Sequence, residues 1–130
     1  MARVLVDTSA VFALLDRGDA NHRAARRTLK ALSTRRVEPL LTNFIVAESH
    51  ALLLARLGGD VARRWLLGNA WPVEWVAEAD EERARRIIAQ HVDKTFSYVD
   101  ATSFAVMERR GIRTAFAFDP HFRQFGYQVV

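Results

Sequence analysis

Short apolar segments alternate with helix-forming segments along this chain, and this alternation restricts its fold more than any other feature. The apolar segments lie at residues 4–6, 38–41, 73–76 and 115–118, with an edge strand expected at 127–130. Apolar spacing and capping residues predict helices at about residues 8–15, 20–32, 44–57, 60–69, 78–90 and 98–109. Short apolar strands separated by helices predict an α/β fold with a mainly parallel central sheet.

Composition limits the chemistry open to the chain. Its 130 residues suit one domain over residues 1–130. The absence of cysteine excludes disulfides, thiolate zinc sites and cysteine nucleophiles. The formal net charge is +4, and all but two of the 19 cationic residues are arginine, which hints at a nucleic-acid partner. No apolar run is long enough for a membrane span, and Asp7 interrupts the apolar start, so we expect a cytoplasmic protein with no membrane association.

Two acids directly follow predicted strands. Asp7 ends the first strand, and Asp119 follows the fourth. Ligands of parallel α/β sheets bind beyond the carboxyl ends of the strands, so both acids are candidates for a functional site. A structural role is the alternative for each. Asp7 could cap the following helix, and Asp119 precedes Pro120 as an N-cap precedes a first-turn proline.

Two further acids lie on helix faces that otherwise carry apolar residues. Glu48 lies in one stripe with four apolar side chains, Phe44, Ala51, Leu52 and Ala55. Asp100 is flanked at the same spacings by Phe96, Phe104 and Met107. A buried carboxylate without a cation is costly, and no Lys or Arg stands three or four residues from Glu48. Asp100 also stands three residues after Ser97, at the spacing of a capping box.

These four acids would meet if the first and fourth strands are neighbours, an order that the sequence does not fix. Two unit charges about 6 Å apart repel by about 3 kcal/mol at an effective dielectric of about 20. Six such pairs would cost on the order of 15 kcal/mol, comparable with the stability of a whole domain. The cluster therefore needs protons or cations, and oxygen ligands without cysteine favour Mg²⁺ or Mn²⁺. A metal-activated water attacking a phosphodiester is the chemistry that such a site supports.

Four segments of the chain also resemble a known family. They are Val4 to Ser9, Asn43 to Glu48, Phe96 to Met107 with Gly111-Ile112, and Phe116 to Phe122 with Gly126-Tyr127. In this order and spacing, and over essentially the whole chain, they resemble the PIN-domain family and, within it, the small prokaryotic toxins of the VapC type.

This resemblance implies a three-layer α/β/α fold with a parallel sheet and a divalent-metal-dependent endoribonuclease, a toxin of a toxin–antitoxin pair. The family's catalytic acids map onto Asp7, Glu48, Asp100 and Asp119, and its metal ligands onto Asp7 and Asp100. The expected cofactor is Mg²⁺ or Mn²⁺. The expected partners are RNA, a small antitoxin whose tail covers the site, and a second copy of the chain in a homodimer.

Other residues carry weaker signals. Ser9 matches a hydroxyl residue found near the site in the family, and His121 stands at its mouth, so both are candidates for substrate binding. His121 could equally be an ordinary surface histidine, and the four histidines show no zinc-ligand spacing. Asp93 falls where many relatives carry an acid, but Lys94 could simply pair with it. The tryptophan-rich stretch from Trp65 to Trp75 is core or a surface for a partner.

Two other classes of function stay open at this point. An aspartyl-nucleophile phosphatase is disfavoured because a second aspartate is missing two residues after Asp7. The second class is a non-catalytic module that binds RNA or protein on the same fold. The loss of one of the four acids would favour this alternative, but all four are present. No glycine-rich phosphate loop occurs.

Overall fold

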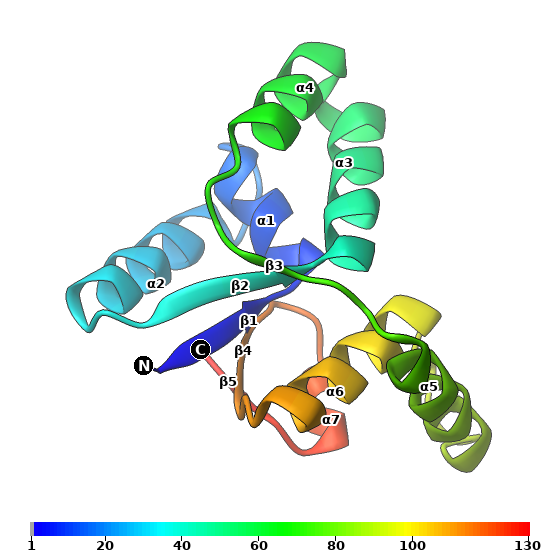
Figure 1. Cartoon of the computed structure of the whole chain (residues 1–130). Coiled ribbons are helices and arrows are strands. Elements are labelled where there is room, and N and C mark those ends of the chain that lie inside the picture. Colours follow the sequence, from blue (N-terminus) through cyan, green and yellow to red (C-terminus); the bar gives the residue numbers. More distant parts are fainter. Residues whose placement is uncertain (1) are drawn as a thin grey trace.

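The fold is a parallel sheet between two groups of helices. The computed structural model describes residues 2–130 and contains a five-stranded sheet of order β3-β2-β1-β4-β5, in which every pairing is parallel. In Figure 1 the helices α1 to α4 lie on one side of the sheet and α5 to α7 on the other. The α/β class with three layers is confirmed.

The elements follow the predicted alternation, except that a short helix at His121–Phe125 was not among the predicted ones. The strands are β1 (Arg3–Val6), β2 (Glu38–Thr42), β3 (Val73–Glu74), β4 (Thr114–Phe116) and β5 (Gln128–Val129). The helices are α1 (Thr8–Leu15), α2 (His22–Thr34), α3 (Asn43–Leu57), α4 (Gly59–Gly68), α5 (Glu78–Gln90), α6 (Tyr98–Arg110) and α7 (His121–Phe125). No helix within residues 2–130 is both long and apolar enough to cross a membrane.

Capping residues start and end the helices that carry the acids. Asp7 caps α1 by accepting from the Ser9 N–H, and Thr42 caps α3 by accepting from the Ile45 N–H. The capping box predicted at the start of α6 is present. Gly111 ends that helix with a φ of 66°, a left-handed conformation that glycine adopts without strain. The caps of α1 and α3 fix where β1 and β2 end and the following helix begins, at the carboxyl edge of the sheet.

Three strands are shorter than predicted, including β5, which spans Gln128–Val129 where 127–130 was expected, and two of the three end early for one shared reason. The apolar runs extended to Val76 and Phe118, whereas β3 ends at Glu74 and β4 ends at Phe116. The reason is that side chains take over the backbone hydrogen bonds. The Val76 N–H donates to Asn43 Oδ1, and the Phe118 N–H donates to Ser9 Oγ. The chain therefore leaves the sheet early at both places.

The core lies on both faces of the central strand. Val4, Leu5 and Val6 of β1 are at most 1% exposed, which explains why this strand has no polar face. On the side of α6, residues 100–107 are all buried, and the Phe104 ring stacks on Phe125 at 4.4 Å between centroids. The central strand thus carries Asp7 at a rigid, fully packed position.

Candidate active site

The first part of the site forms where the two central strands end. β1 pairs with β4 through Val6 and Phe116, and the Asp7 N–H donates to the Phe116 carbonyl oxygen at 2.9 Å. Asp7 follows β1 directly, and Asp119 follows β4 after two further residues. β1 and β4 are therefore neighbours, and this order brings Asp7 and Asp119 to the same edge of the sheet.

Ser9 connects the ends of these strands. Its hydroxyl donates to Asp7 Oδ2 at 2.7 Å and accepts from the Phe118 N–H at 2.9 Å. Its backbone N–H also donates to Asp7 Oδ2, at 3.2 Å. The Ser9 hydroxyl thus fixes the position of the Asp7 carboxylate relative to the segment that leads to Asp119.

The surroundings of Asp7 disfavour the ionised form of its carboxyl group. Its side chain is buried, with 3% of the residue exposed. Burial, together with the neighbouring Asp119 carboxylate, raises the pKa of Asp7 from its ordinary value of 3.8 to about 8, although the hydrogen bonds from Ser9 act in the opposite direction. A bound cation would reverse this effect, because it favours the ionised carboxylate.

The second part of the site groups Asp100, Asp119 and His121. One ligand atom from each of these residues lies within 4.8 Å of the others. His121 Nδ1 lies 2.7 Å from Asp100 Oδ2 and 3.9 Å from Asp119 Oδ1. The backbone N–H of His121 donates to Asp119 Oδ1 at 2.9 Å, and that of Ser97 donates to Asp100 Oδ2 at 3.0 Å. Both carboxylates are therefore held by local backbone donors.

Sequence reasoning missed part of the role of His121. It placed this residue at the mouth of the site, but it did not foresee the contact with Asp100. Residues 100 and 121 lie far apart in the sequence, so no local spacing signals this pair. Thr95 was also missed, and its Oγ1 lies 3.4 Å from His121 Nε2.

Glu48 is placed differently from the three aspartates. The face of α3 that is buried carries Ile45, Ser49 and Leu53, so the predicted apolar stripe around Glu48 was wrong in part. Ala51 and Ala55 of that stripe are exposed, and Glu48 is half-buried at its margin. Within residues 2–130, Glu48 makes no side-chain hydrogen bond or ion pair, and it is not in the Asp100 group. The turn of α3 that carries it is tied to α1, because Ser49 Oγ donates to Thr8 Oγ1 at 3.2 Å.

Within residues 2–130, no lysine or arginine side chain pairs with these acids. Among the described residues, the only ion-pair partner of Asp7, Glu48, Asp100 or Asp119 is His121. Other acids do have partners: Lys94 Nζ lies 2.8 Å from Asp93 Oδ2, the pairing that was considered for Asp93. A buried carboxylate, two further aspartates and one imidazole, without Lys or Arg, fit a divalent cation such as Mg²⁺ or Mn²⁺.

The fold and these acids together define the class of protein. A family model described as PIN domain matches residues 4–126, and the chain belongs to the PIN-domain family. The family resemblance noted in the sequence is thereby confirmed.

Individual relatives give a narrower comparison. The chain is 35% identical over 130 residues to the 23S rRNA-specific endonuclease VapC20 of Mycobacterium tuberculosis, covering 98% of this chain and 97% of the relative. It is 28% identical over 119 residues to Ribonuclease VapC26 of the same species, covering 89% of this chain and 86% of the relative.

Two solved structures are similar to this fold. The crystal structure of M. tuberculosis VapC20, described as a sarcin-ricin loop cleaving toxin, matches with a TM-score of 0.85 at 34% identity and covers 95% of each chain. FitAcB from Neisseria gonorrhoeae matches with a TM-score of 0.65 at 22% identity, covering 97% of this chain and 95% of that chain, which shows the shared fold alone.

Proposed function

We propose that this chain is a single-domain, divalent-metal-dependent endoribonuclease and the toxin of a toxin–antitoxin pair. The observation that carries the proposal is that Asp119 lies beside Asp7 on one side and groups with Asp100 and His121 on the other, while no Lys or Arg within residues 2–130 pairs with these acids. The names of the VapC relatives support the reaction, since they are an endonuclease and a ribonuclease.

Asp7 and Asp100 are the proposed metal ligands, and Asp119 and Glu48 complete the proposed catalytic set. When bound, Mg²⁺ or Mn²⁺ would supply a Lewis acid that activates water and neutralises phosphate charge. The protein residues prepare this site before any ligand arrives. Ser9 orients the Asp7 carboxylate, and Ser97 orients that of Asp100. Preorganised groups of this kind cost no rearrangement during the reaction.

His121 and Ser9 are the proposed contacts to substrate. The side chain of His121 is 22% exposed, so it can reach a phosphate while its Nδ1 stays beside Asp100. Ser9 is half-buried and already uses its hydroxyl twice, which limits it to orienting groups at the base of the site. His121 is therefore the more accessible of the two for contact with RNA.

The proposed substrate is RNA, and the relatives suggest which RNA to test first. VapC20 is named for 23S rRNA, and its structure is described as that of a toxin cleaving the sarcin-ricin loop. We therefore place the sarcin-ricin loop first among the RNAs to test. Because ribosomal RNA is cytoplasmic, we place the protein there as well.

The test is cleavage of defined RNAs by the purified protein. Fragments containing the sarcin-ricin loop and unrelated structured and unstructured RNAs are incubated with Mg²⁺, Mn²⁺ or EDTA, and the cut ends are mapped. We expect specific cuts with metal and none with EDTA.

Variants test the assignment of the acids. Asp7→Asn and Asp100→Asn should each lose nearly all cleavage, since each removes ligand charge. Asp93→Asn is the matched control, an exposed acid paired with Lys94 outside the proposed set, and it should cut like the wild type. Wild-type cleavage by either of the first two variants, with metal still required, overturns the assignment.

The proposed protein partner is a small antitoxin, and the proposed assembly is a homodimer. A groove of about 330 Å³ between α1, α2 and α4 has an apolar lining that includes Leu14, Leu15, Leu29, Trp65 and Trp71. Such a groove suits the apolar side of a partner segment. An arginine elsewhere in the partner could pair with the acids and take the place of the metal cation.

A further inference from the structure

The tryptophans around β3 divide into two kinds. Trp65 and Trp71 are half-buried and pack against the core, whereas Trp75 is 71% exposed. Among the large hydrophobic side chains exposed within residues 2–130, Trp75 is the only aromatic one. Single exposed hydrophobic residues are common, so exposure alone assigns no role.

What distinguishes Trp75 is the rigidity of the backbone that carries it. The preceding residue, Glu74, pairs through Oε2 with Arg109 Nη1 at 3.3 Å and through Oε1 with Arg110 Nη1 at 2.7 Å. Arg109 Nη2 also donates to the Trp75 carbonyl oxygen at 3.4 Å. The C-terminal end of α6 therefore anchors both Glu74 and the peptide of Trp75 itself.

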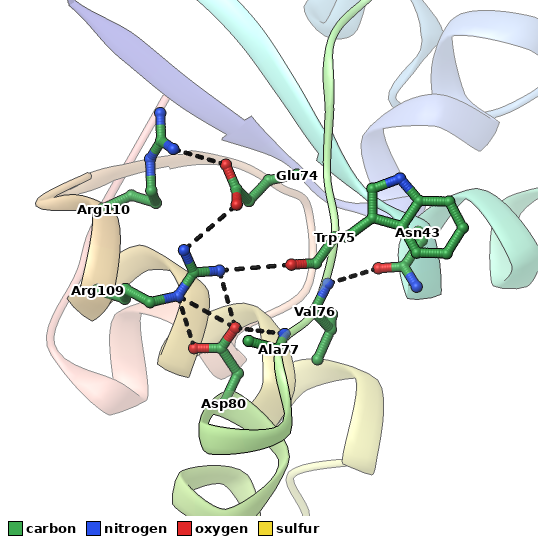
Figure 2. A network of polar contacts seen from close by, with 8 residues as sticks. All are labelled: Asn43, Glu74, Trp75, Val76, Ala77, Asp80, Arg109 and Arg110. Atoms are coloured by element: carbon green, nitrogen blue, oxygen red, sulfur yellow. Dashed lines mark hydrogen bonds and ion pairs between the residues drawn. The ribbon is translucent and has the colours of Figure 1, made fainter.

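The residues after Trp75 are anchored as well. The Val76 N–H donates to Asn43 Oδ1 at 2.7 Å, and the Ala77 N–H donates to Asp80 Oδ2 at 2.8 Å. Asp80 in turn accepts from Arg109 Nη2 at 2.8 Å. Figure 2 shows the Trp75 indole on the opposite side of this segment from the Arg109 guanidinium. Three helices thus hold the segment while the ring points away from the anchor.

Trp75 also lies at the edge of the sheet that carries the acids. It directly follows β3 as Asp7 directly follows β1, and the parallel pairing puts both strand ends at the same edge. Only β2 lies between these strands. With neighbouring strands about 4.8 Å apart, the two strand ends lie about 10 Å from each other. A short single-stranded segment of nucleic acid spans that distance.

We propose that Trp75 stacks on a base of the RNA that flanks the scissile phosphate and helps to select where the cut falls. This inference rests on the proposed ribonuclease function. Proteins that recognise RNA by sequence mostly bind unstacked bases on aromatic side chains. A ring on an anchored backbone loses little conformational freedom on binding, so it can contribute strongly. The shared edge with the acids favours RNA over a protein surface as the occupant.

The test measures stacking directly. Trp75→Ala and Trp75→Phe are made in the Asp100→Asn protein, in which cleavage is blocked. A short RNA that the wild type cuts carries the fluorescent base 2-aminopurine at one position at a time. The parent protein should quench the probe at one position beside the cut. Trp75→Ala should lose this quenching and bind about 5-fold to 150-fold more weakly, and Trp75→Phe should keep most of both.

Controls separate stacking from other causes. Leu67→Ala removes another exposed apolar side chain, 78% exposed on α4, and should leave quenching and affinity unchanged. The salt dependence of affinity should be the same for Trp75→Ala and its parent, because no phosphate contact is removed. Thermal unfolding should confirm that each variant is folded.

Three results would overturn the inference. Unchanged quenching and affinity in Trp75→Ala would show that the ring does not contact RNA. Dissociation of a dimer by Trp75→Ala, seen by analytical ultracentrifugation, would assign the ring to an interface between two copies. Failure of the wild type to cut any RNA with Mg²⁺ or Mn²⁺ would remove the proposed function itself, and it would be seen before any Trp75 variant is made.

Discussion

Asp7 is a buried acid beside a second acid, so the metal-free protein should lose stability as the pH rises. The pKa of Asp7 is about 8 in the folded chain against an ordinary value of 3.8, and between these values the folded chain holds a proton that the unfolded chain releases. This contribution to stability is complete below the ordinary pKa and is lost as the pH rises through about 8.

The change to test is Asp7→Asn, which cannot ionise. In EDTA, the free energy of unfolding of the wild type should fall relative to Asp7→Asn by more than ~1 kcal/mol between about pH 5 and about pH 8. Urea denaturation of both proteins at the two pH values measures this difference. Parallel pH dependence of the two proteins would contradict the raised pKa.

Metal should stabilise the folded chain, because the acids meet only in the native state. We expect the Tm of EDTA-treated protein to rise with millimolar Mn²⁺ or Mg²⁺, and to rise less in Asp7→Asn. Differential scanning calorimetry measures both shifts, and Asp93→Asn is the control that should respond like the wild type. If millimolar metal leaves the Tm of the wild type unchanged, the acids do not form a metal site of useful affinity.

At the scale of single residues, the sequence identified the acids better than their surroundings. Asp7, Asp100 and Asp119 were recognisable because each departs from its local pattern, after a strand or on a buried helix face. The contact between His121 and Asp100 joins two separate elements, and local spacing holds no information about such a contact. Glu48 was assigned to an apolar stripe, but α3 buries the adjacent face, since alanines satisfy a helical pattern without requiring burial.

At the scale of elements, the loop between β3 and α5 depends on one buried acid. Asp80 is 3% exposed and accepts three hydrogen bonds from Arg109 as well as one from the Ala77 N–H. Burial alone would raise the pKa of Asp80, but these hydrogen bonds and the charge of Arg109 outweigh it and lower the pKa. The stability that Asp80 contributes is therefore present above its ordinary pKa and is lost as the pH falls through the lowered one.

We expect Asp80→Ala to lower the free energy of unfolding by about 1–3 kcal/mol at neutral pH, since it leaves Arg109 without its main partner. The difference from the wild type should shrink as the pH falls below the ordinary pKa of 3.8 and through the lowered one, because Asp80 then becomes protonated in both states. Asp60→Ala removes an exposed pair with Arg64 and should change stability by less than ~0.5 kcal/mol. Urea denaturation of the three proteins measures these values, and equal losses in both variants would contradict the assignment.

Most element boundaries followed from local patterns, and two of the exceptions share one cause. Apolar runs predicted the strands, and caps such as Thr42 and Gly111 fixed the helix ends. β3 and β4 stop early because distant side chains, Asn43 and Ser9, replace a neighbouring strand as hydrogen-bond partner. Contacts of this kind join residues far apart in the sequence, so a local pattern cannot reveal them.

At the scale of the whole molecule, the strand order decided whether the acids meet. The sequence predicted parallel strands, but it could not establish that β1 lies beside β4. The rule for connections between parallel strands fixes the handedness of each crossover and leaves the order of the strands in the sheet open. The family resemblance implied a parallel sheet between two layers of helices, and the structure shows the order β3-β2-β1-β4-β5.

First contact with RNA should be electrostatic, because the chain carries a net charge of +4 supplied mostly by arginine. With Asp100→Asn to block cleavage, the affinity for a labelled RNA should fall at least about tenfold between about 50 mM and about 200 mM salt. Fluorescence anisotropy over this range measures the slope. An affinity independent of salt would favour binding that reads bases without phosphate contacts.

The partner proposal predicts an assembly that can be isolated. The chain should sediment as a dimer, and affinity purification from its native cell should recover a small, separately encoded protein whose addition suppresses RNA cleavage. A monomer that recovers no such protein and is harmless when overproduced would contradict the toxin assignment and leave the nuclease assignment standing.

The Ser9 hydroxyl bridges the beginning of the chain and the backbone at Phe118, 109 residues further on. Since Asp7 is synthesised early and Asp119 late, a ribosome making this protein carries an incomplete set of acids for most of the synthesis. We therefore expect a chain that stops before β4 to leave RNA uncut, if Asp119 has the proposed catalytic role. On the proposed assignment, cutting activity should begin only once the segment beyond β4 has been made and has closed onto Ser9.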